Sequence, residues 1–205
     1  MVGILGEEVE RLAGLGADFI QLDEPVLTEL VFAQGRTRTF MCASLAARKD
    51  PEEELEFAVS LLSRVLQRAG GVRTGLHVCR GNWSRDESTL LSGTYAPLAP
   101  WLERLPVTQL VLEYATPRAG RLVAPGDKEL GLGVVNPRID EVETPEAITE
   151  RARLALAQVE ARRLFLNPDC GFGTFASRPM NSPETAKRKL HAMAEAARRL
   201  REEFD

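Results

Sequence analysis

The chain has 205 residues, a formal net charge of −4, 44% hydrophobic residues and 27% charged residues, which is typical of a globular domain with a sizeable core. The charge gives no drive toward nucleic acid or anionic membranes, and no apolar run approaches the roughly 18 residues that cross a bilayer. Three widely spaced cysteines are not a disulfide framework, and the first residues do not read as a signal peptide. The sequence therefore predicts one domain over residues 1–205, in the cytoplasm, with small-molecule rather than nucleic-acid or membrane partners.

Helical and strand patterns alternate along the chain. Helices are expected at 3–15, 50–69, 96–105, 144–161 and from 182 to the C-terminus. Strands are expected at 18–23, 72–79, 107–113, 130–135 and 163–167. Glu24-Pro25 should end the first strand, because Pro cannot continue a central ladder, and residues 28–50 should form a long connection. The alternation predicts an α/β fold with parallel strands and helical crossovers.

Residues with metal-binding chemistry follow three of these strands. His77 and Cys79 lie two positions apart at a strand end, so they project to the same side. Glu113 ends the next strand, and Cys170 follows the last one. Parallel α/β folds place their ligands at the carboxyl ends of strands, and Zn²⁺ accepts nitrogen, sulfur and oxygen ligands. The four residues are therefore a candidate zinc site.

Each candidate also has a simpler interpretation. An isolated buried Cys is more often a small hydrophobic residue than a ligand, and Cys42, which has no partner pattern, is interpreted as structural. Glu113 could pair with a nearby Arg, and Asp23-Glu24 could cap the following turn. By position alone, Arg80, Trp83 and Arg118 are further candidates to line a pocket. The basic C-terminal helix, which includes Lys187, Arg188, Lys189 and His191, is interpreted as a solvated face.

The order of these motifs resembles one enzyme family. Residues 20–25 (IQLDEP), His77-Val78-Cys79, Glu113 and residues 167–171 (NPDCG) resemble the C-terminal catalytic barrel of cobalamin-independent methionine synthase. They resemble still more its single-barrel relatives, which include the zinc-dependent epoxyalkane–coenzyme M transferase. The resemblance implies a (β/α)₈ TIM-type barrel, a catalytic zinc held by His77, Cys79, Cys170 and a displaceable Glu113, and Asp23 as the ligand of a substrate amino group.

Two departures from the family pattern are visible. Such a barrel needs about 250 residues, so about five C-terminal βα units are expected here, with the N-terminal strands missing. Either the sequence is a fragment, or the gene is truncated, or another chain supplies the missing part. Five parallel strands would leave two unpaired sheet edges, which would be liable to associate. The family's catalytic His would fall on Val135, which leaves the alkyl donor open.

The resemblance implies zinc-dependent methyl or alkyl transfer to a thiol, in the class of homocysteine S-methyltransferases. The alternative is a truncated zinc-binding barrel that is inactive alone or needs a partner chain. A lyase of the related uroporphyrinogen decarboxylase barrel group is a third interpretation, but those enzymes use no metal, and the His77, Cys79 and Cys170 set would then have no role.

Overall fold

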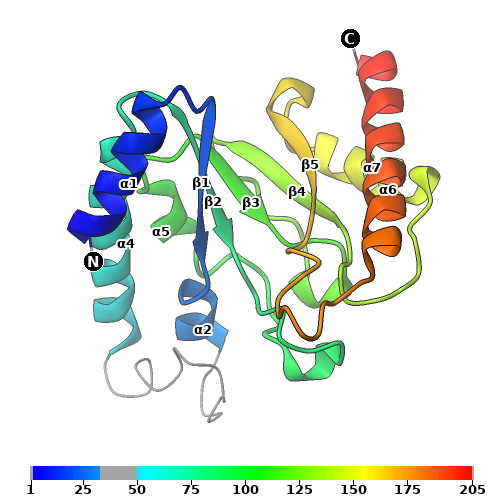
Figure 1. Ribbon diagram of the computed structural model, residues 1–205, viewed down its shortest axis with the longest axis horizontal. Coiled ribbons are helices and arrows are strands. Elements are labelled where there is room, and N and C mark those ends of the chain that lie inside the picture. Colours follow the sequence, from blue (N-terminus) through cyan, green and yellow to red (C-terminus); the bar gives the residue numbers. More distant parts are fainter. Residues whose placement is uncertain (1, 33–49, 205) are drawn as a thin grey trace.

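The computed structural model describes residues 2–32 and 50–204 and contains one sheet of five parallel strands flanked by helices (Figure 1). The strands follow each other in sequence order across the sheet: β1 (Phe19–Glu24), β2 (Arg73–Val78), β3 (Gln109–Leu112), β4 (Glu129–Val135) and β5 (Leu164–Pro168). The helices are α1 (Val2–Gly14), α2 (Leu27–Phe32), α4 (Pro51–Leu66), α5 (Ala99–Glu103), α6 (Pro145–Leu156) and α7 (Pro183–Phe204). Cys42 lies outside the described residues.

The parallel α/β architecture expected from the sequence is confirmed, and so are all five strands. Helix boundaries differ more: the second helix passes into a 3₁₀ turn at Gln67, and the one expected over 96–105 is α-helical only at its centre. Helix α2 was missed altogether, since residues 28–50 were expected to be a connection. Its start is set by Glu24, whose carboxylate accepts hydrogen bonds from the backbone N–H groups of Val26 (2.9 Å) and Leu27 (2.7 Å).

Side-chain capping defines the helix starts that the sequence did predict. The Asp50 carboxylate accepts hydrogen bonds from the N–H groups of Glu52 (2.8 Å) and Glu53 (3.3 Å) at the start of α4. The hydroxyl of Thr144 does the same for Ala147 at the start of α6. In both helices a Pro occupies the first turn, where no N–H donor is needed.

Because side chains alternate along each strand, one face of the sheet packs against the helices and the other carries the candidate site residue His77. One face of the sheet carries buried leucines and valines that share a core with residues of α2, α4, α5, α6 and α7. This core includes Leu76, Val78, Leu110, Leu112, Leu130 and Leu132. The opposite face carries Asp23, His77 and Val111, which lie side by side in register across β1, β2 and β3. The register therefore places His77 beside Asp23 near the carboxyl end of the sheet.

Lys189 corrects the interpretation of the last helix. It is fully buried, although the sequence placed it on a solvated face with Lys187, Arg188 and His191, all of which are exposed. Its ammonium group pairs with Glu143 Oε2 at 2.8 Å and donates to the backbone oxygen of Glu141. Glu143 in turn accepts a hydrogen bond from the N–H of Asn136 at 2.7 Å. Lys189 thus ties α7 to the loop after β4, and charge patterning alone could not distinguish it from its neighbours.

Replacing Lys189 by Met should destabilise the protein by about 2 kcal/mol, because a charge-assisted hydrogen bond is lost and Glu143 keeps its charge. Urea unfolding followed by circular dichroism measures the loss. Lys187→Met, in the same helix but exposed, is the matched control and should change the free energy of unfolding by less than about 0.5 kcal/mol. Equal stability of the two variants would show that the buried pair contributes nothing.

Within the described part of the chain, no helix combines the length and apolar character that crossing a membrane requires.

Candidate metal centre

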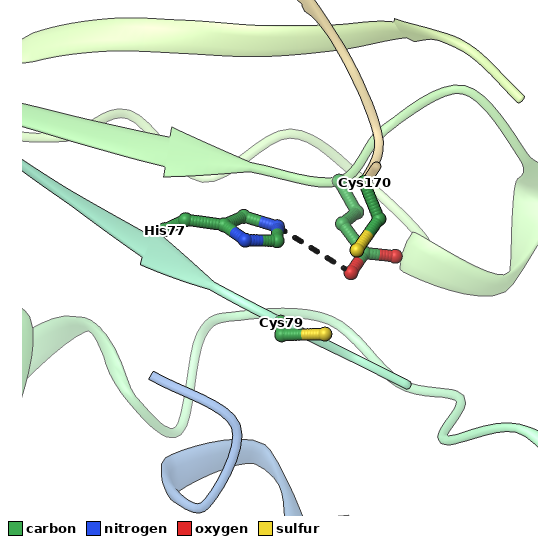
Figure 2. A group of neighbouring side chains, drawn as sticks. His77, Cys79 and Cys170 are labelled. Atoms are coloured by element: carbon green, nitrogen blue, oxygen red, sulfur yellow. Dashed lines mark ion pairs between the residues drawn. The ribbon is translucent and has the colours of Figure 1, made fainter. Parts of the chain in front are cut away.

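Four side chains converge where β2, β3 and β5 end. His77 lies on β2, Cys79 directly follows it, Glu113 follows β3, and Cys170 follows β5. One potential ligand atom from each of the four lies within 4.8 Å of all the others. Figure 2 shows the imidazole of His77 and the sulfur atoms of Cys79 and Cys170 directed toward a common region. The structure therefore brings together the four residues that the sequence grouped.

His77 is fixed by hydrogen bonds on both ring nitrogens. Its Nδ1 lies 2.7 Å from Asp23 Oδ1, and its Nε2 lies 3.0 Å from the backbone oxygen of Asp169 and 3.7 Å from Glu113 Oε1. Burial opposes the charged imidazolium, but the hydrogen bond with Asp23 and the nearby Glu113 carboxylate outweigh it and raise the pKa of His77 to about 10. Because Nδ1 faces Asp23, Nε2 is the nitrogen directed at the other three donors. A carboxylate on the remote nitrogen is a common arrangement for a metal-binding His.

The Cys79 thiol is buried directly after β2. Its sulfur accepts a hydrogen bond from the N–H of Gly81 at 3.3 Å, and its carbonyl oxygen accepts one from the hydroxyl of Thr28 at 2.5 Å. Gly81 has a φ of +94°, and a Cβ there would lie 2.1 Å from the ring of Trp83, so only glycine fits. The hydrogen bond with Cys170, burial and the charge of Glu113 raise the pKa of the Cys79 thiol. Without a metal, this cluster therefore favours thiol over thiolate.

Glu113 has donors on both of its oxygens and is 1% exposed. Oε1 accepts a hydrogen bond from the N–H of Arg80 at 2.7 Å, and Oε2 is ion-paired with Arg118. Burial raises the pKa of Glu113, but the nearby imidazole of His77 and the charges of Arg118 and Arg138 together lower it below its ordinary value. The alternative interpretation of Glu113 as an arginine partner is thus seen in the structure, alongside its position in the four-residue cluster.

Arg138 is the residue of this region that the sequence interpretation overlooked. Its guanidinium is completely buried and pairs with Asp169 Oδ2 at 3.1 Å and with Glu87 Oε1 at 3.1 Å. Asp169 is itself buried, which raises its pKa to about 6 against the opposing charge of Arg138. Gly133 makes room for it, since a Cβ there would lie 2.2 Å from Asp169 Oδ1. The only available signal was the position of Arg138 just after a strand.

An open cleft of about 370 Å³ lies beside the two cysteines. Its lining comprises Asp23, Pro25, Cys79, Gly81, Asn82, Trp83, Cys170, Gly171, Gly173 and Thr174. Asn82 holds its two walls together by donating to the backbone oxygen of Gly171 (2.7 Å) and to the hydroxyl of Thr174 (2.6 Å). The Asp23 side chain is 65% exposed although it bonds to His77. Arg80 and Arg118, candidates to line a pocket by position, are instead buried behind Glu113.

The donor set fits Zn²⁺. One imidazole nitrogen, two sulfurs and one carboxylate oxygen are the ligand types that zinc binds in tetrahedral sites, and the carboxylate is the most easily replaced of them. The shifted pKa values also fit a ligand set without its metal. They favour a protonated Cys79 thiol, a protonated His77 imidazole and an ionised Glu113 carboxylate. The geometry therefore suits a metal that displaces protons from sulfur and nitrogen.

Zinc affinity should rise steeply with pH. His77 and the cysteines must lose protons to bind a metal, and the pKa values of His77 and Cys79 are both raised. Each displaced proton contributes about a tenfold gain in affinity per pH unit, over the range below the pKa of the group. The folding stability of the zinc-free chain should change with pH in the opposite direction to zinc affinity. The stability contributed by charged His77 is fully present below about pH 6.5 and is lost as the pH rises through about 10. Chelator competition at pH 6, 7 and 8 measures the affinity, and an affinity independent of pH would contradict this protonation scheme.

Comparisons with known proteins agree with the fold. Residues 102–199 match the family model described as the catalytic domain of cobalamin-independent synthase. The chain is 29% identical over 206 aligned residues to a methionine synthase of Pyrococcus abyssi, covering 98% of this chain and 49% of that protein. It is 30% identical over 171 residues to a methionine synthase of Thermococcus kodakarensis, covering 82% of this chain and 41% of that protein.

The same fold occurs in a solved structure. The chain superposes on a B12-independent methionine synthase from Shewanella, solved in complex with selenomethionine, with a TM-score of 0.76 and 22% identity. The match covers 98% of this chain and 54% of that one, so the chain spans about half the length of the relatives it matches. The expected TIM-barrel-type fold, represented here by five parallel strands, is thereby confirmed. Sequence and fold together make this chain a relative of the catalytic domain of cobalamin-independent methionine synthase.

Proposed function

We propose that the chain binds Zn²⁺ through His77, Cys79, Glu113 and Cys170 and uses it to transfer a methyl or other alkyl group to a thiol. The observation that carries the proposal is the convergence of these four ligand atoms within 4.8 Å of one another beside an open cleft. The named relatives add the class of reaction, since they are methionine synthases. Homocysteine is accordingly the first thiol to test.

Zinc, when bound, supplies the Lewis acidity that keeps a coordinated thiol deprotonated at neutral pH, where a free thiol with a pKa of about 8.5 is mostly protonated. The side chains of this chain prepare the site. His77 is oriented by Asp23, and the cleft beside Cys79 and Cys170 admits a small substrate. Glu113 is the ligand that a thiol can replace without removing a sulfur from the set.

Asp23 is the proposed contact for an amino group on the thiol substrate. Its Oδ1 is engaged with His77, but most of the side chain is exposed at the wall of the cleft. A carboxylate there would favour a cationic substrate group and disfavour an anionic one. At the position of the family's catalytic His stands Val135, which is fully buried and cannot protonate a leaving group. The alkyl donor is therefore not assigned.

X-ray absorption at the zinc edge tests the proposal. The zinc-loaded protein should show a mixed shell of sulfur with nitrogen and oxygen, and homocysteine should replace one light ligand by sulfur. A thiol without an amino group, 2-mercaptoethanesulfonate, should do so only at higher concentration if Asp23 binds the amine. A zinc shell that neither thiol alters would refute thiol activation at this site.

A further inference from the structure

We propose that Arg118 is a positioning residue that receives the Glu113 carboxylate when a thiol takes its place on zinc. This inference rests on the function proposed above and assigns a role to a residue outside the donor set. In this view, the charge of Arg118 sets how readily Glu113 leaves the metal and therefore how tightly the thiol binds.

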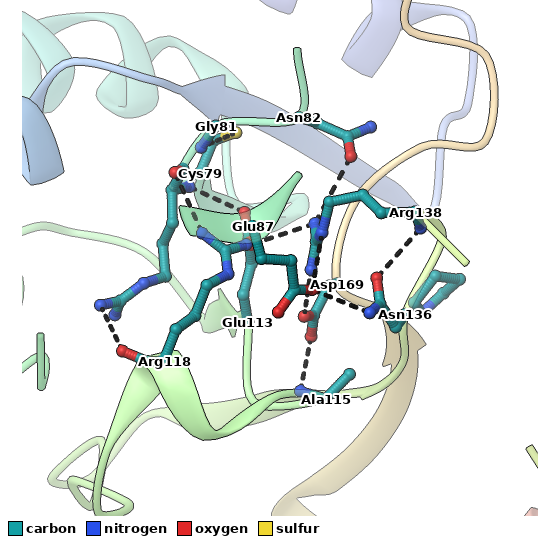
Figure 3. A network of polar contacts seen from close by, with 12 residues as sticks. Cys79, Gly81, Asn82, Glu87, Glu113, Ala115, Arg118, Asn136, Arg138 and Asp169 are labelled. Carbon is teal, nitrogen blue, oxygen red and sulfur yellow. Dashed lines mark hydrogen bonds and ion pairs between the residues drawn. The ribbon is translucent and has the colours of Figure 1, made fainter. Parts of the chain in front are cut away.

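Glu113 lies between the other three proposed metal ligands and the guanidinium of Arg118. Its Oε1 lies 3.7 Å from His77 Nε2, on the side of the four-residue cluster. Its Oε2 is ion-paired with Nη2 of Arg118, and Arg138 Nη1 lies 3.8 Å from the same oxygen (Figure 3). A small rotation of the carboxylate is therefore enough to shift it from one partner to the other.

Glu113 lies in a cluster of buried charged side chains. Four ionised side chains lie together, and all are almost completely buried: Arg118 (7% exposed), Arg138 (0%), Glu113 (1%) and Asp169 (1%). The fully buried Arg80 adds a third positive charge to the two arginines and two carboxylates of this group. A carboxylate released from zinc into an apolar interior would be costly, but Glu113 would be released into an existing ion pair. The network thus lowers the cost of the displaced state.

Arg118 itself is held in place by the backbone. Its Nη1 donates to the carbonyl oxygens of Arg80 (3.2 Å) and Leu91 (3.1 Å), and it lies in the short 3₁₀ turn Pro117–Ala119. Since the guanidinium is fixed by these contacts, it is the carboxylate that moves. Figure 3 shows the side chains of Arg118 and Arg138 directed toward Glu113.

Removing Arg118 should affect zinc affinity differently in the two possible roles of this residue, as a partner for displaced Glu113 or as a group that only orients it. Neutralising Arg118 removes the alternative partner and the charge that weakens the carboxylate as a ligand, so Glu113 should hold zinc more tightly. Homocysteine should then bind about tenfold more weakly to the zinc-loaded protein, while zinc affinity is unchanged or higher. A residue that only orients a metal ligand would lower zinc affinity by roughly 10–100-fold when removed.

The test compares wild type, Arg118→Gln, Arg118→Lys and Arg104→Gln. The last is the matched control, because Arg104 forms an exposed ion pair with Glu56 away from the site. Zinc affinity is measured by chelator competition, and homocysteine affinity of the zinc-loaded proteins by calorimetry. We expect the weakest thiol binding in R118Q and a smaller loss in R118K, which keeps the charge but not the forked contacts with Glu113 and the backbone. R104Q should bind the thiol as wild type does. In a Glu113→Gln background, the R118Q change should no longer affect thiol binding.

The outcomes separate this inference from the proposed function. If wild type binds zinc and homocysteine, and R118Q does the same with equal affinities, the role of Arg118 is refuted and the zinc site stands. Loss of zinc affinity in R118Q would also refute it, in favour of simple orientation. A wild-type protein that binds no zinc would overturn both. Should R118Q not fold, a structure of the wild-type zinc–homocysteine complex decides: Glu113 paired with Arg118 and off the metal supports the inference, and Glu113 on the metal refutes it.

Discussion

Cys79→Ala and Cys170→Ala should each abolish near-stoichiometric zinc binding. A thiolate is among the strongest zinc ligands, and a four-ligand site has an apparent binding free energy of about 10–16 kcal/mol at pH 7. Losing one of four ligands should therefore weaken binding by at least about 3 kcal/mol, which is more than a hundredfold in Kd. Metal content after dialysis, measured by inductively coupled plasma mass spectrometry, detects the loss.

Two variants control for this prediction. Cys42→Ala makes the same chemical change at a cysteine that the sequence gives no metal-binding partners. His191→Ala removes the other histidine of the chain, which is exposed on α7. Both should keep zinc at the wild-type level. Zinc retained near one per chain in C79A and C170A would show that the metal binds elsewhere.

Arg138→Met should destabilise the protein by about 3–5 kcal/mol, because it leaves buried carboxylates without their counter-ion. Arg138 is completely buried between Asp169, Glu87 and Glu113, and Met fills a similar volume without the charge. Arg104→Met, which breaks an exposed pair, should cost less than about 1 kcal/mol. Urea unfolding at pH 7 measures both.

The loss in R138M should shrink at acid pH. The pKa of Asp169 is already raised to about 6 by burial, above its value in the unfolded chain, and removing Arg138 raises it further. A carboxyl with a raised folded-state pKa destabilises the protein as the pH rises through the interval between its unfolded and folded values. The difference between wild type and R138M should therefore be larger at pH 8 than at pH 5. Equal losses at both pH values would mean that Asp169 is not the group left uncompensated.

The site was more predictable from the sequence than its surroundings were. His77, Cys79, Glu113 and Cys170 follow strands of a parallel sheet, so strand periodicity and topology suffice to bring them together. Capping residues at Asp50 and Thr144 likewise fixed two helix starts, because the hydrogen bonds involved are local. These features depend on contacts near in sequence or on a regular fold.

Long-range charge pairing could not be predicted in the same way. Lys189 lies among exposed basic residues, and only the packing of α7 against the loop after β4 shows that it is buried on Glu143. Arg138 and Asp169 are 31 positions apart, and neither has a local pattern that identifies the other. Helix α2 was missed although its cap was not: Asp23-Glu24 was expected as a possible cap of the following turn, and Glu24 fills that place, but residues 28–50 were expected to be a connection.

The most direct test of thiol activation is the number of protons released when homocysteine binds at pH 7. Calorimetry of the zinc-loaded protein in two buffers with different ionisation enthalpies gives this number. We predict about one proton per homocysteine bound, because the thiol enters as thiolate and Glu113 stays ionised beside Arg118. The zinc-free protein should release none. Homocysteine binding to the zinc-loaded protein without proton release would contradict coordination of the thiolate and, with it, the proposed chemistry.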